Sequence, residues 1–355
     1  MVVCAAALGQ GGLVTTTVTG TATAADRVPV EGVNGTAQAG AARSTRPATA
    51  AEQVGVVDIT SVLDYGSAEA AGTGVVLTPS GEILTNNHVI DGATKITATV
   101  VATGRSYAAA VVGTDPGDDV AVLRLSGATG LRTARIATAA QVAVGDAVTA
   151  VGNAGGKGGT PTAASGSVVG LGRDITASAE NGTDAERLAG LIEVDAAVQA
   201  GDSGGPLYAG GAVIGIDTAA STSGRDRVAT TAAQTSSAGF AIPITTATAV
   251  AERIVGGEQS TTIHQGSPAF LGVQLPGGAD GATIAGVVTG SPAATAGLRA
   301  GDTITSVDGT AIDQANALSD ALAKHRPQDH VTVGWTDTEG TSHSASVTLT
   351  TGPAD

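Results

Sequence analysis

The sequence is poor in the residues that cross-link or anchor many proteins. Among its 355 residues there is one cysteine, Cys4, so no disulfide can form within the chain. Aromatic residues make up 2% of the sequence, and any buried core is therefore aliphatic. No stretch reaches the roughly 18 consecutive apolar residues that a membrane-spanning helix needs.

Basic residues are also few. The 17 lysines and arginines are outnumbered by 32 aspartates and glutamates, the net charge is −15, and the basic residues form no cluster. A protein that binds nucleic acid or an anionic membrane surface needs a basic patch. The charge therefore argues against both kinds of partner.

Small and β-branched residues are abundant instead. Residues 1–52 consist largely of alanine, threonine, glycine and valine without periodicity, and we predict a low-complexity tail there. Residues 1–18 are apolar but lack the basic start of a signal peptide. They are interpreted either as the remainder of a signal or membrane anchor, or as a plain disordered tail.

Residues 53–257 have the texture of a β protein. Short β-branched runs alternate with turn residues at spacings of about 8 to 12 residues, which is typical of an all-β sandwich or barrel. The clearest runs are residues 74–77, 98–101, 120–123, 147–151 and 212–216.

The pattern changes towards the end of this region. Residues 245–255 are predicted as an amphipathic helix that stops at a pair of glycines. The polar residues 258–268 are predicted as a linker. A second unit follows at residues 269–352, in which strand-like runs alternate with helices expected at 292–298 and 313–325.

Residues 201–207 (GDSGGPL) carry the strongest signal for chemistry. A serine nucleophile needs an exposed hydroxyl group and nearby backbone N–H groups that stabilise an oxyanion. Glycines on both sides of Ser203 allow the tight backbone turn that this arrangement requires. An ordinary glycine-rich turn is the competing interpretation, and the proline, leucine and strand-like run that follow weaken it.

A serine nucleophile also needs a base, and His88 is the best candidate because it ends a strand-like run. Asp119, just before an apolar strand, is the candidate that orients the imidazole. Asp118 and Asp115 compete with it and are interpreted as solvated turn residues. The other histidines have no motif around them and are expected at the surface: His264, His325, His330 and His343.

His88 and Asp119 fall in the first half of the β region and Ser203 in the second half. Two small barrels with a cleft between them would bring the three side chains together. These motifs resemble the HtrA (Deg) family of trypsin-like serine proteases with a C-terminal PDZ domain. The matching stretches are residues 85–89 (TNNHV), 119–123 (DVAVL), 195–207, 213–216 (VIGI) and 239–243 (GFAIP).

The resemblance implies a mainly β fold, with a trypsin-like double β-barrel protease domain followed by an α+β PDZ domain. The family's catalytic triad carries over to His88, Asp119 and Ser203. Its oxyanion hole carries over to the backbone N–H groups of Gly201, Asp202 and Ser203, and no cofactor or metal is implied. Asp202 and Asp217 stand where asparagine is common in the family, but neither change removes a catalytic atom.

The specificity pocket is expected to be lined by Ala197, Ala200, Asp217 and Thr218. Ala197 stands six residues before the serine, where trypsin carries an aspartate. Without an acidic floor, a bound lysine or arginine would be an unpaired buried charge. We therefore expect cleavage after small or medium aliphatic residues, unless the carboxylate of Asp217 faces the pocket.

Residues 269–273 look like the carboxylate-binding loop of a PDZ domain, and residues 290–304 match its helix, turn and strand. A bound peptide would add as a strand beside this loop. Its terminal carboxylate would rest on the N–H groups of Leu271, Gly272 and Val273. Leu318 and Leu322 either face this groove or belong to the core.

The resemblance thus implies a serine endopeptidase that cleaves unfolded or specific envelope proteins in protein quality control, outside the cytoplasm. It allows a membrane tether upstream of the chain, and a homotrimer for which Tyr65 is the one aromatic residue near the contact side. A chaperone or scaffold with latent proteolysis is a second hypothesis, since loops at 152–165 and 181–200 can rest in an inactive arrangement. A signalling protease for one membrane substrate is a third hypothesis, and a secreted digestive-type protease is a fourth.

Overall fold

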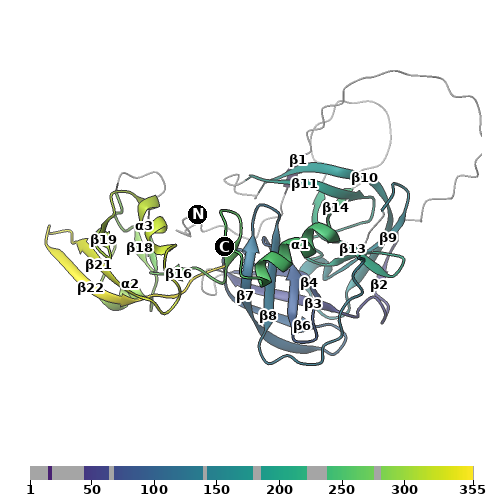
Figure 1. The fold of residues 1–355 in the computed structure, drawn as a ribbon, viewed down its shortest axis with the longest axis horizontal. Coiled ribbons are helices and arrows are strands. Elements are labelled where there is room, and N and C mark those ends of the chain that lie inside the picture. Colours follow the sequence, from purple (N-terminus) through teal and green to yellow (C-terminus); the bar gives the residue numbers. More distant parts are fainter. Residues whose placement is uncertain are drawn as a thin grey trace, which may run out of the picture.

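The computed structural model describes residues 44–63, 68–138, 142–178, 185–221, 238–275 and 281–354, together with the backbone of a short strand at 15–17. Two β-barrels lie side by side, and a smaller domain of strands and short helices extends from them (Figure 1). Within the described residues no helix is long and apolar enough to cross a membrane. Cys4 and Tyr65 lie outside the described residues.

The first barrel is built from six antiparallel strands. It closes because β7 pairs with both β6 and β8, while β3 pairs with β4 and β6. Alternating buried and exposed positions along β6 turn one face inward onto an aliphatic core. The strands are β3 (Val56–Leu63), β4 (Ala68–Val76), β5 (Glu82–Thr85), β6 (Ala93–Val100), β7 (Arg105–Asp115) and β8 (Val120–Leu125).

The second barrel also has six antiparallel strands, and β9 closes it by pairing with β10 and β12. Its core is aliphatic and rich in alanine, as the composition predicts. A 3-10 turn, η2 (Ala154–Gly156), follows its first strand. The strands are β9 (Ala147–Gly152), β10 (Thr162–Ser178), β11 (Ala185–Val194), β12 (Pro206–Ala209), β13 (Ala212–Ser221) and β14 (Ala238–Pro243), and β1 (Thr15–Thr17) pairs with β10.

Helix α1 (Ile244–Val255) joins the two barrels (Figure 1). It contacts β7 and β8 of the first barrel and β13 and β14 of the second. Its apolar face, which includes Ile244, Val250 and Ile254, is buried in a cluster with residues from both barrels. The helix predicted over 245–255 is confirmed, and its role is to fix the barrels against each other, so that a site between them is held rigidly.

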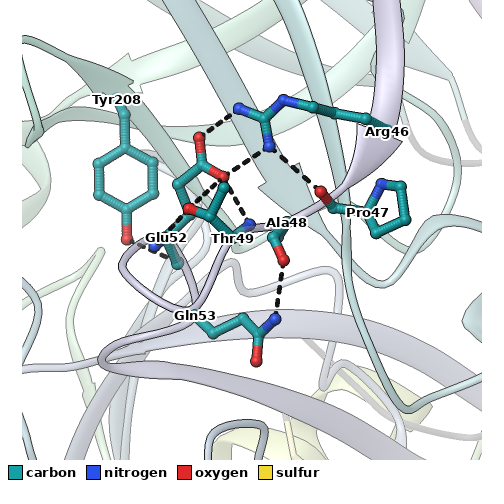
Figure 2. A network of polar contacts seen from close by, with 7 residues as sticks. All are labelled: Arg46, Pro47, Ala48, Thr49, Glu52, Gln53 and Tyr208. Carbon is teal, nitrogen blue, oxygen red and sulfur yellow. Dashed lines mark hydrogen bonds and ion pairs between the residues drawn. The ribbon is translucent and has the colours of Figure 1, made fainter.

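The predicted tail boundary at residue 52 is too late in the sequence. Strand β2 (Ser44–Pro47) pairs with β10, and Ala48 is 5% exposed within the core. Arg46 holds this segment through two hydrogen bonds to the Glu52 carboxylate, at 2.8 and 2.7 Å (Figure 2). The Arg46 guanidinium lowers the pKa of Glu52 to about 2.

Glu52 also links this segment to the second barrel. Its carboxylate accepts the backbone N–H of Thr49 at 2.8 Å, and the Tyr208 hydroxyl of β12 donates to its backbone carbonyl at 3.3 Å (Figure 2). Since both partners of the Arg46–Glu52 pair are accessible to water, the pair contributes little to the free energy of unfolding. Because its composition is of low complexity, the sequence did not reveal this ordered segment, which runs from the second barrel to β3.

The predicted linker 258–268 is in part packed against the first barrel. Ile263 is 0% exposed in the core beneath α1, and β15 (His264–Gln265) pairs with β7. The amide of Gln265 donates to the carbonyls of Ile254 and Glu258, at 2.9 and 2.7 Å. His264, expected at the surface, is therefore a half-buried residue of a sheet edge.

The second unit is an α+β domain around its own aliphatic core. Its helices are shorter than predicted, because Ser291 caps the start of α2 and Gly297, at φ 92°, ends it after five residues. The elements are β16 (Ala269–Phe270), β17 (Val273–Gln274), β18 (Gly286–Val287), α2 (Pro292–Ala296), β19 (Thr303–Val307), β20 (Thr310–Ala311), α3 (Ala315–Leu322), β21 (His330–Thr336), β22 (Ser342–Thr348) and β23 (Thr350–Thr351).

The residues that follow β23 return to the first barrel. Ala354 donates its N–H to the carbonyl of Ala93 at 2.9 Å and accepts the N–H of Gly92 at 2.8 Å. Its side chain is 1% exposed in the core cluster of the first barrel. The second unit is thus attached to this barrel both before its first strand and after its last.

Candidate active site

His88 lies in a short turn that follows β5. The carbonyl of Asn87 accepts the N–H groups of Ile90 and Asp91, both at 2.9 Å, and this fixes the turn. Asn86 and Asn87 are buried beneath it, at 0% and 3% exposure. The His88 side chain is 31% exposed, so its ring is accessible from one side.

Asp119 lies in the turn between β7 and β8, with a positive φ of 53° that only a few residue types adopt readily. Its side chain is 0% exposed. Its two oxygens lie 3.0 and 2.9 Å from Nδ1 of His88, and one of them also accepts the His88 backbone N–H at 3.0 Å. Asn86 donates to the Asp119 carbonyl at 2.9 Å and holds the turn in place.

Thr218, in β13, links Asp119 to the serine. Its hydroxyl donates to the other carboxylate oxygen of Asp119. Its backbone carbonyl accepts the Ser203 hydroxyl at 3.2 Å. The three residues predicted from motifs are therefore joined by one chain of hydrogen bonds that runs from His88 through Asp119 and Thr218 to Ser203.

This arrangement bears on the predicted specificity pocket. The Thr218 hydroxyl is directed at Asp119 and is not available to a bound side chain, and the place of Thr218 in the pocket wall stays a prediction. Asp217 is 0% exposed and does not present its carboxyl group to a solvent-filled pocket. Ala197 is half-buried and Ala200 is exposed, and their place in the pocket stays a prediction. The only sequence signal for the role of Thr218 is its position after the VIGI strand.

The turn that contains Ser203 requires glycine at the next position. Gly204 has φ 83°, and a Cβ there would lie 2.0 Å from the Thr73 carbonyl oxygen. The Ser203 carbonyl accepts the N–H of Thr73 at 2.8 Å, and the N–H of Gly204 donates to the Asp217 carbonyl at 2.7 Å. The turn is thus pinned to both barrels, and the serine is held in a defined orientation.

The predicted oxyanion hole needs one correction. The N–H of Asp202 donates to the carbonyl of Gln199 at 3.0 Å and is therefore not available to a substrate. In the neighbouring peptide, the Ala200 carbonyl accepts the N–H of Gly155 at 2.8 Å. A trans peptide directs its N–H opposite to its carbonyl. The N–H of Gly201 therefore points away from that loop, which leaves Gly201 and Ser203 as the candidate donors.

Two further carboxyl groups are buried beside this turn. Asp217 is fully buried, and neither of its carboxyl oxygens has a hydrogen-bond partner among the described residues. Burial, reinforced by the charge of Asp202, raises the pKa of Asp217 well above its usual value. Burial also raises the pKa of Asp202 to about 6, although its carboxylate accepts the N–H of Gln199 at 2.9 Å.

Replacing Asp202 with asparagine is expected to stabilise the protein at pH 7.5 and not at pH 4. The folded state holds the Asp202 proton more tightly than the unfolded state, whose pKa is near 3.8, so stability falls as pH rises from about 4 through 6. Asparagine carries no charge to desolvate. The difference between the two pH values in the stabilisation by Asp202→Asn is expected to be about 2 kcal/mol.

Urea unfolding of both proteins at pH 4 and 7.5 measures this difference. Ser106→Ala, at an exposed serine of β7, is the control, since it neither adds nor removes a titratable group and should change stability equally at both pH values. The same change for Asp202→Asn at both values would contradict the raised pKa.

The remaining histidines lie away from this site in the described part of the chain. His325 and His343 approach aspartates of the second unit, and His343 also stacks on Trp335. The Thr348 hydroxyl lies 2.9 Å from the His330 ring. Among the described residues no group of three or more histidine, cysteine, aspartate or glutamate side chains is placed to hold a metal ion.

The loop before β17 carries the N–H groups that were predicted to bind a terminal carboxylate. The carbonyl of Leu271 accepts the N–H of Ala293, and that of Gly272 accepts the N–H of Val288, both at 2.9 Å. Because trans peptides direct N–H opposite to C=O, the N–H groups of Gly272 and Val273 point away from α2 and β18. Leu318 is 3% exposed and belongs to the core, which was one of the two predicted placements, and Leu322 is half-buried against that core.

Two closed antiparallel barrels, with His88 and Asp119 on turns of the first and Ser203 on a turn of the second, define the trypsin-like class of peptidase folds. The family model described as trypsin-like peptidase domain matches residues 72–216, and the PDZ domain model matches residues 269–349. Both fold predictions are confirmed by these matches.

Comparison with curated proteins identifies relatives of the chain within this class. It is 33% identical over 345 residues to the serine protease PepD of Mycobacterium tuberculosis, covering 91% of this chain and 72% of that protein. It is 35% identical over 282 residues to the periplasmic pH-dependent serine endoprotease DegQ of Escherichia coli, covering 75% and 56%. The solved structure of the HtrA-type protease AlgW with tripeptide is 26% identical, with a TM-score of 0.48, and covers 86% of this chain and 97% of that one.

The chain belongs to the HtrA family of trypsin-like serine proteases with a PDZ domain. It spans 72% of PepD, and between 50% and 62% of DegQ, DegP and the other relatives that follow in similarity.

Proposed function

We propose that this chain is a serine endopeptidase in which Ser203 attacks the peptide carbonyl carbon. His88 takes the proton of the Ser203 hydroxyl and later gives it to the leaving amine, and water then releases the acyl group by the same steps. Asp119 holds the imidazole in the required tautomer and stabilises its cation. The observation that carries this proposal is the pairing of the buried Asp119 carboxylate with Nδ1 of His88 at 2.9 Å.

The oxyanion would form against the N–H groups of Gly201 and Ser203. A preorganised donor of this kind typically stabilises the transition state by about 3 kcal/mol, because it points at the developing charge in a site from which water is excluded. The Asp202 carboxyl group stands next to the nucleophile, and its raised pKa of about 6 means that its negative charge is disfavoured there.

The proposal is tested by mapping both the cleavage and the nucleophile. Purified chain is incubated with unfolded β-casein, and fragment ends are identified by mass spectrometry. A fluorophosphonate probe, which reacts with activated serines, is applied in parallel. We expect cleavage, and labelling of Ser203 alone among the serines. Cleavage together with labelling at any other residue, or neither cleavage nor labelling, would refute the proposed function.

The same fragment ends test the proposed specificity. With Ala197 and Ala200 at the pocket and Asp217 buried away from solvent, the residue before the cleaved bond is expected to be small or medium aliphatic. A profile dominated by lysine or arginine would show that a carboxylate reaches the pocket.

The PDZ domain is proposed to bind peptides through their free terminal carboxylate. The same hydrophobic-ended peptides, with free and with amidated ends, are compared by fluorescence anisotropy. Amidation removes a charge-assisted set of hydrogen bonds and is expected to weaken binding about tenfold or more. Gly272→Ala is expected to abolish binding, since a Cβ there would lie 2.2 Å from Cβ of Ser291. Equal affinity for both peptide forms would refute the carboxylate mode.

The proposed location is outside the cytoplasm, because several relatives are named periplasmic endoproteases. The proposed substrates are unfolded or specific envelope proteins, with C-terminal peptides as ligands of the PDZ domain. A homotrimer and a membrane tether upstream of the chain remain proposals that rest on the family alone; Tyr65, the aromatic residue of the expected trimer contact, lies outside the described residues.

A further inference from the structure

The carboxyl group of Asp58 reaches from the first barrel to a loop beside the serine turn. Asp58 lies in β3 and is 7% exposed. Its Oδ2 accepts the N–H of Gly159 at 3.1 Å, and its Oδ1 has no hydrogen-bond partner among the described residues. Burial raises the pKa of Asp58 to about 6, and the bond from Gly159 opposes that shift. Burying a carboxyl group in a strand costs free energy, and the hydrogen bond to Gly159 is what offsets part of this cost.

The loop that Asp58 holds, residues 153–159, contains two hydrogen bonds of its own, from the Gly156 N–H to the Asn153 carbonyl and from the Gly158 N–H to Oδ1 of Asn153, both at 2.7 Å. Four of its seven residues are glycines with φ values of 75°, 65°, 67° and 90°: Gly155, Gly156, Gly158 and Gly159. Glycines gain more conformational freedom on release than other residues, so bonds from outside the loop add to the order that these two bonds provide. One such bond runs from the Asn153 N–H to the Thr73 hydroxyl at 2.9 Å, at the start of the loop. Asp58 provides the corresponding bond at its end.

Between these two anchors the loop contacts the oxyanion turn. The N–H of Gly155 donates to the Ala200 carbonyl at 2.8 Å. The backbones also pack closely, since a Cβ on Gly201 would lie 2.3 Å from the Asn153 carbonyl oxygen. The plane of the peptide between residues 200 and 201 is therefore set by the loop, and the direction of the Gly201 N–H is set with it.

We propose that Asp58 is a positioning residue for the oxyanion hole. By holding Gly159 it fixes the loop 153–159, and through Gly155 the loop orients the Gly201 N–H towards the substrate. The inference rests on the proposed function, in which the Gly201 N–H stabilises the oxyanion. It assigns a role in the reaction to a side chain that does not touch the substrate.

The test compares two substitutions, one that removes the hydrogen-bond acceptor and one that keeps it. Asp58→Leu removes the hydrogen-bond acceptor, whereas Asp58→Asn keeps an oxygen that can accept the Gly159 N–H. Hydrolysis of a peptide substrate is measured per active site, with sites titrated by the fluorophosphonate probe. Losing one oxyanion donor costs about 10²- to 10³-fold in kcat, and a displaced donor less, so we expect kcat of Asp58→Leu to fall about 10- to 100-fold. KM should change less than about threefold, and Asp58→Asn should stay within about threefold of the wild type.

A transition-state analogue separates positioning from general destabilisation. The affinity of a peptide aldehyde, whose adduct with the serine carries the oxyanion, should fall in Asp58→Leu by the same factor as kcat/KM. Asp302→Leu is the matched control, since the Asp302 carboxylate is also buried and accepts a backbone N–H, that of Arg299 at 2.9 Å, but in the PDZ domain. It is expected to lower the melting temperature without changing kcat. Asp58→Ala serves as a second variant if leucine prevents folding.

The outcomes distinguish the two proposals. If the wild type hydrolyses the substrate and kcat per active site is unchanged in Asp58→Leu or Asp58→Ala, the role of Asp58 is overturned. The proposed function is then left intact. An equal loss in Asp58→Asn and Asp58→Leu would also overturn it, because the acceptor would then be irrelevant. A wild-type protein without Ser203-dependent turnover would overturn the proposed function itself.

Discussion

Replacing Ser203 with alanine is expected to reduce hydrolysis of unfolded casein by about 10⁵- to 10⁶-fold, because the acyl-enzyme pathway is lost and only binding and the oxyanion donors remain. Removing Oγ deletes the nucleophile and its bond to the Thr218 carbonyl at 3.2 Å. It leaves Gly201 and Gly204, which shape the turn, in place. The fold and the melting temperature should therefore be close to those of the wild type.

Casein fragments quantified by mass spectrometry over time measure this loss. Ser106→Ala, at an exposed serine of β7, is the matched control and should retain full activity. Peptide binding to the PDZ domain should be the same in the wild type and in Ser203→Ala. If Ser203→Ala cleaves casein as the wild type does, Ser203 is not the nucleophile. If the wild type itself is inactive while it binds peptides, the scaffold hypothesis is favoured.

Replacing Asp119 with asparagine is expected to lower kcat by about 10⁴-fold with little change in KM. The Asp119 carboxylate accepts three hydrogen bonds, two from His88 and one from the Thr218 hydroxyl. An amide of the same shape has one oxygen fewer to accept them, and its NH2 group favours the His88 tautomer that accepts at Nδ1. In that tautomer Nε2 carries the proton, and His88 has no lone pair there with which to take the proton of Ser203.

Steady-state kinetics on a peptide substrate measure this effect, with Asp118→Asn as the control. Asp118 is the neighbouring residue and is exposed, so its substitution should leave kcat within about twofold of the wild type. The comparison also decides between Asp119 and Asp118, two of the three aspartates that the sequence offered. A larger loss in Asp118→Asn than in Asp119→Asn would reverse the assignment.

The fold could be predicted from the sequence because its strands and its helix α1 follow from local sequence patterns. Runs such as residues 120–123 and 147–151 alternate with turns, and each became a strand of a closed barrel. The helix over 245–255 was predictable from its apolar spacing and the glycines that follow. His88, Asp119 and Ser203 were predictable because their chemistry demands particular neighbours within a few residues of each.

Features that depend on pairing between distant segments were not predictable. Residues 44–47 and 264–265 are strands only because β10 and β7 offer them an edge, and their polar composition says nothing of that partner. The loss of the Asp202 N–H from the oxyanion hole depends on a turn closed by Gln199. The bond from the Thr218 hydroxyl to Asp119 was not predicted, because sequence order does not reveal which way a hydroxyl group in a strand points.

The two attachments of the PDZ domain to the first barrel have a mechanical consequence. Residues 264–265 hold it to β7, and Ala354 holds it to residues 92–93. A domain that is attached to a barrel at two separate points can rotate about the line that joins these points, but its other movements relative to the barrel are restricted. The segment that contains Ala354 follows directly on β23, the partner of β16. It is hydrogen-bonded to the chain four residues beyond His88. A displacement of the PDZ domain would therefore be transmitted to the turn that carries this histidine.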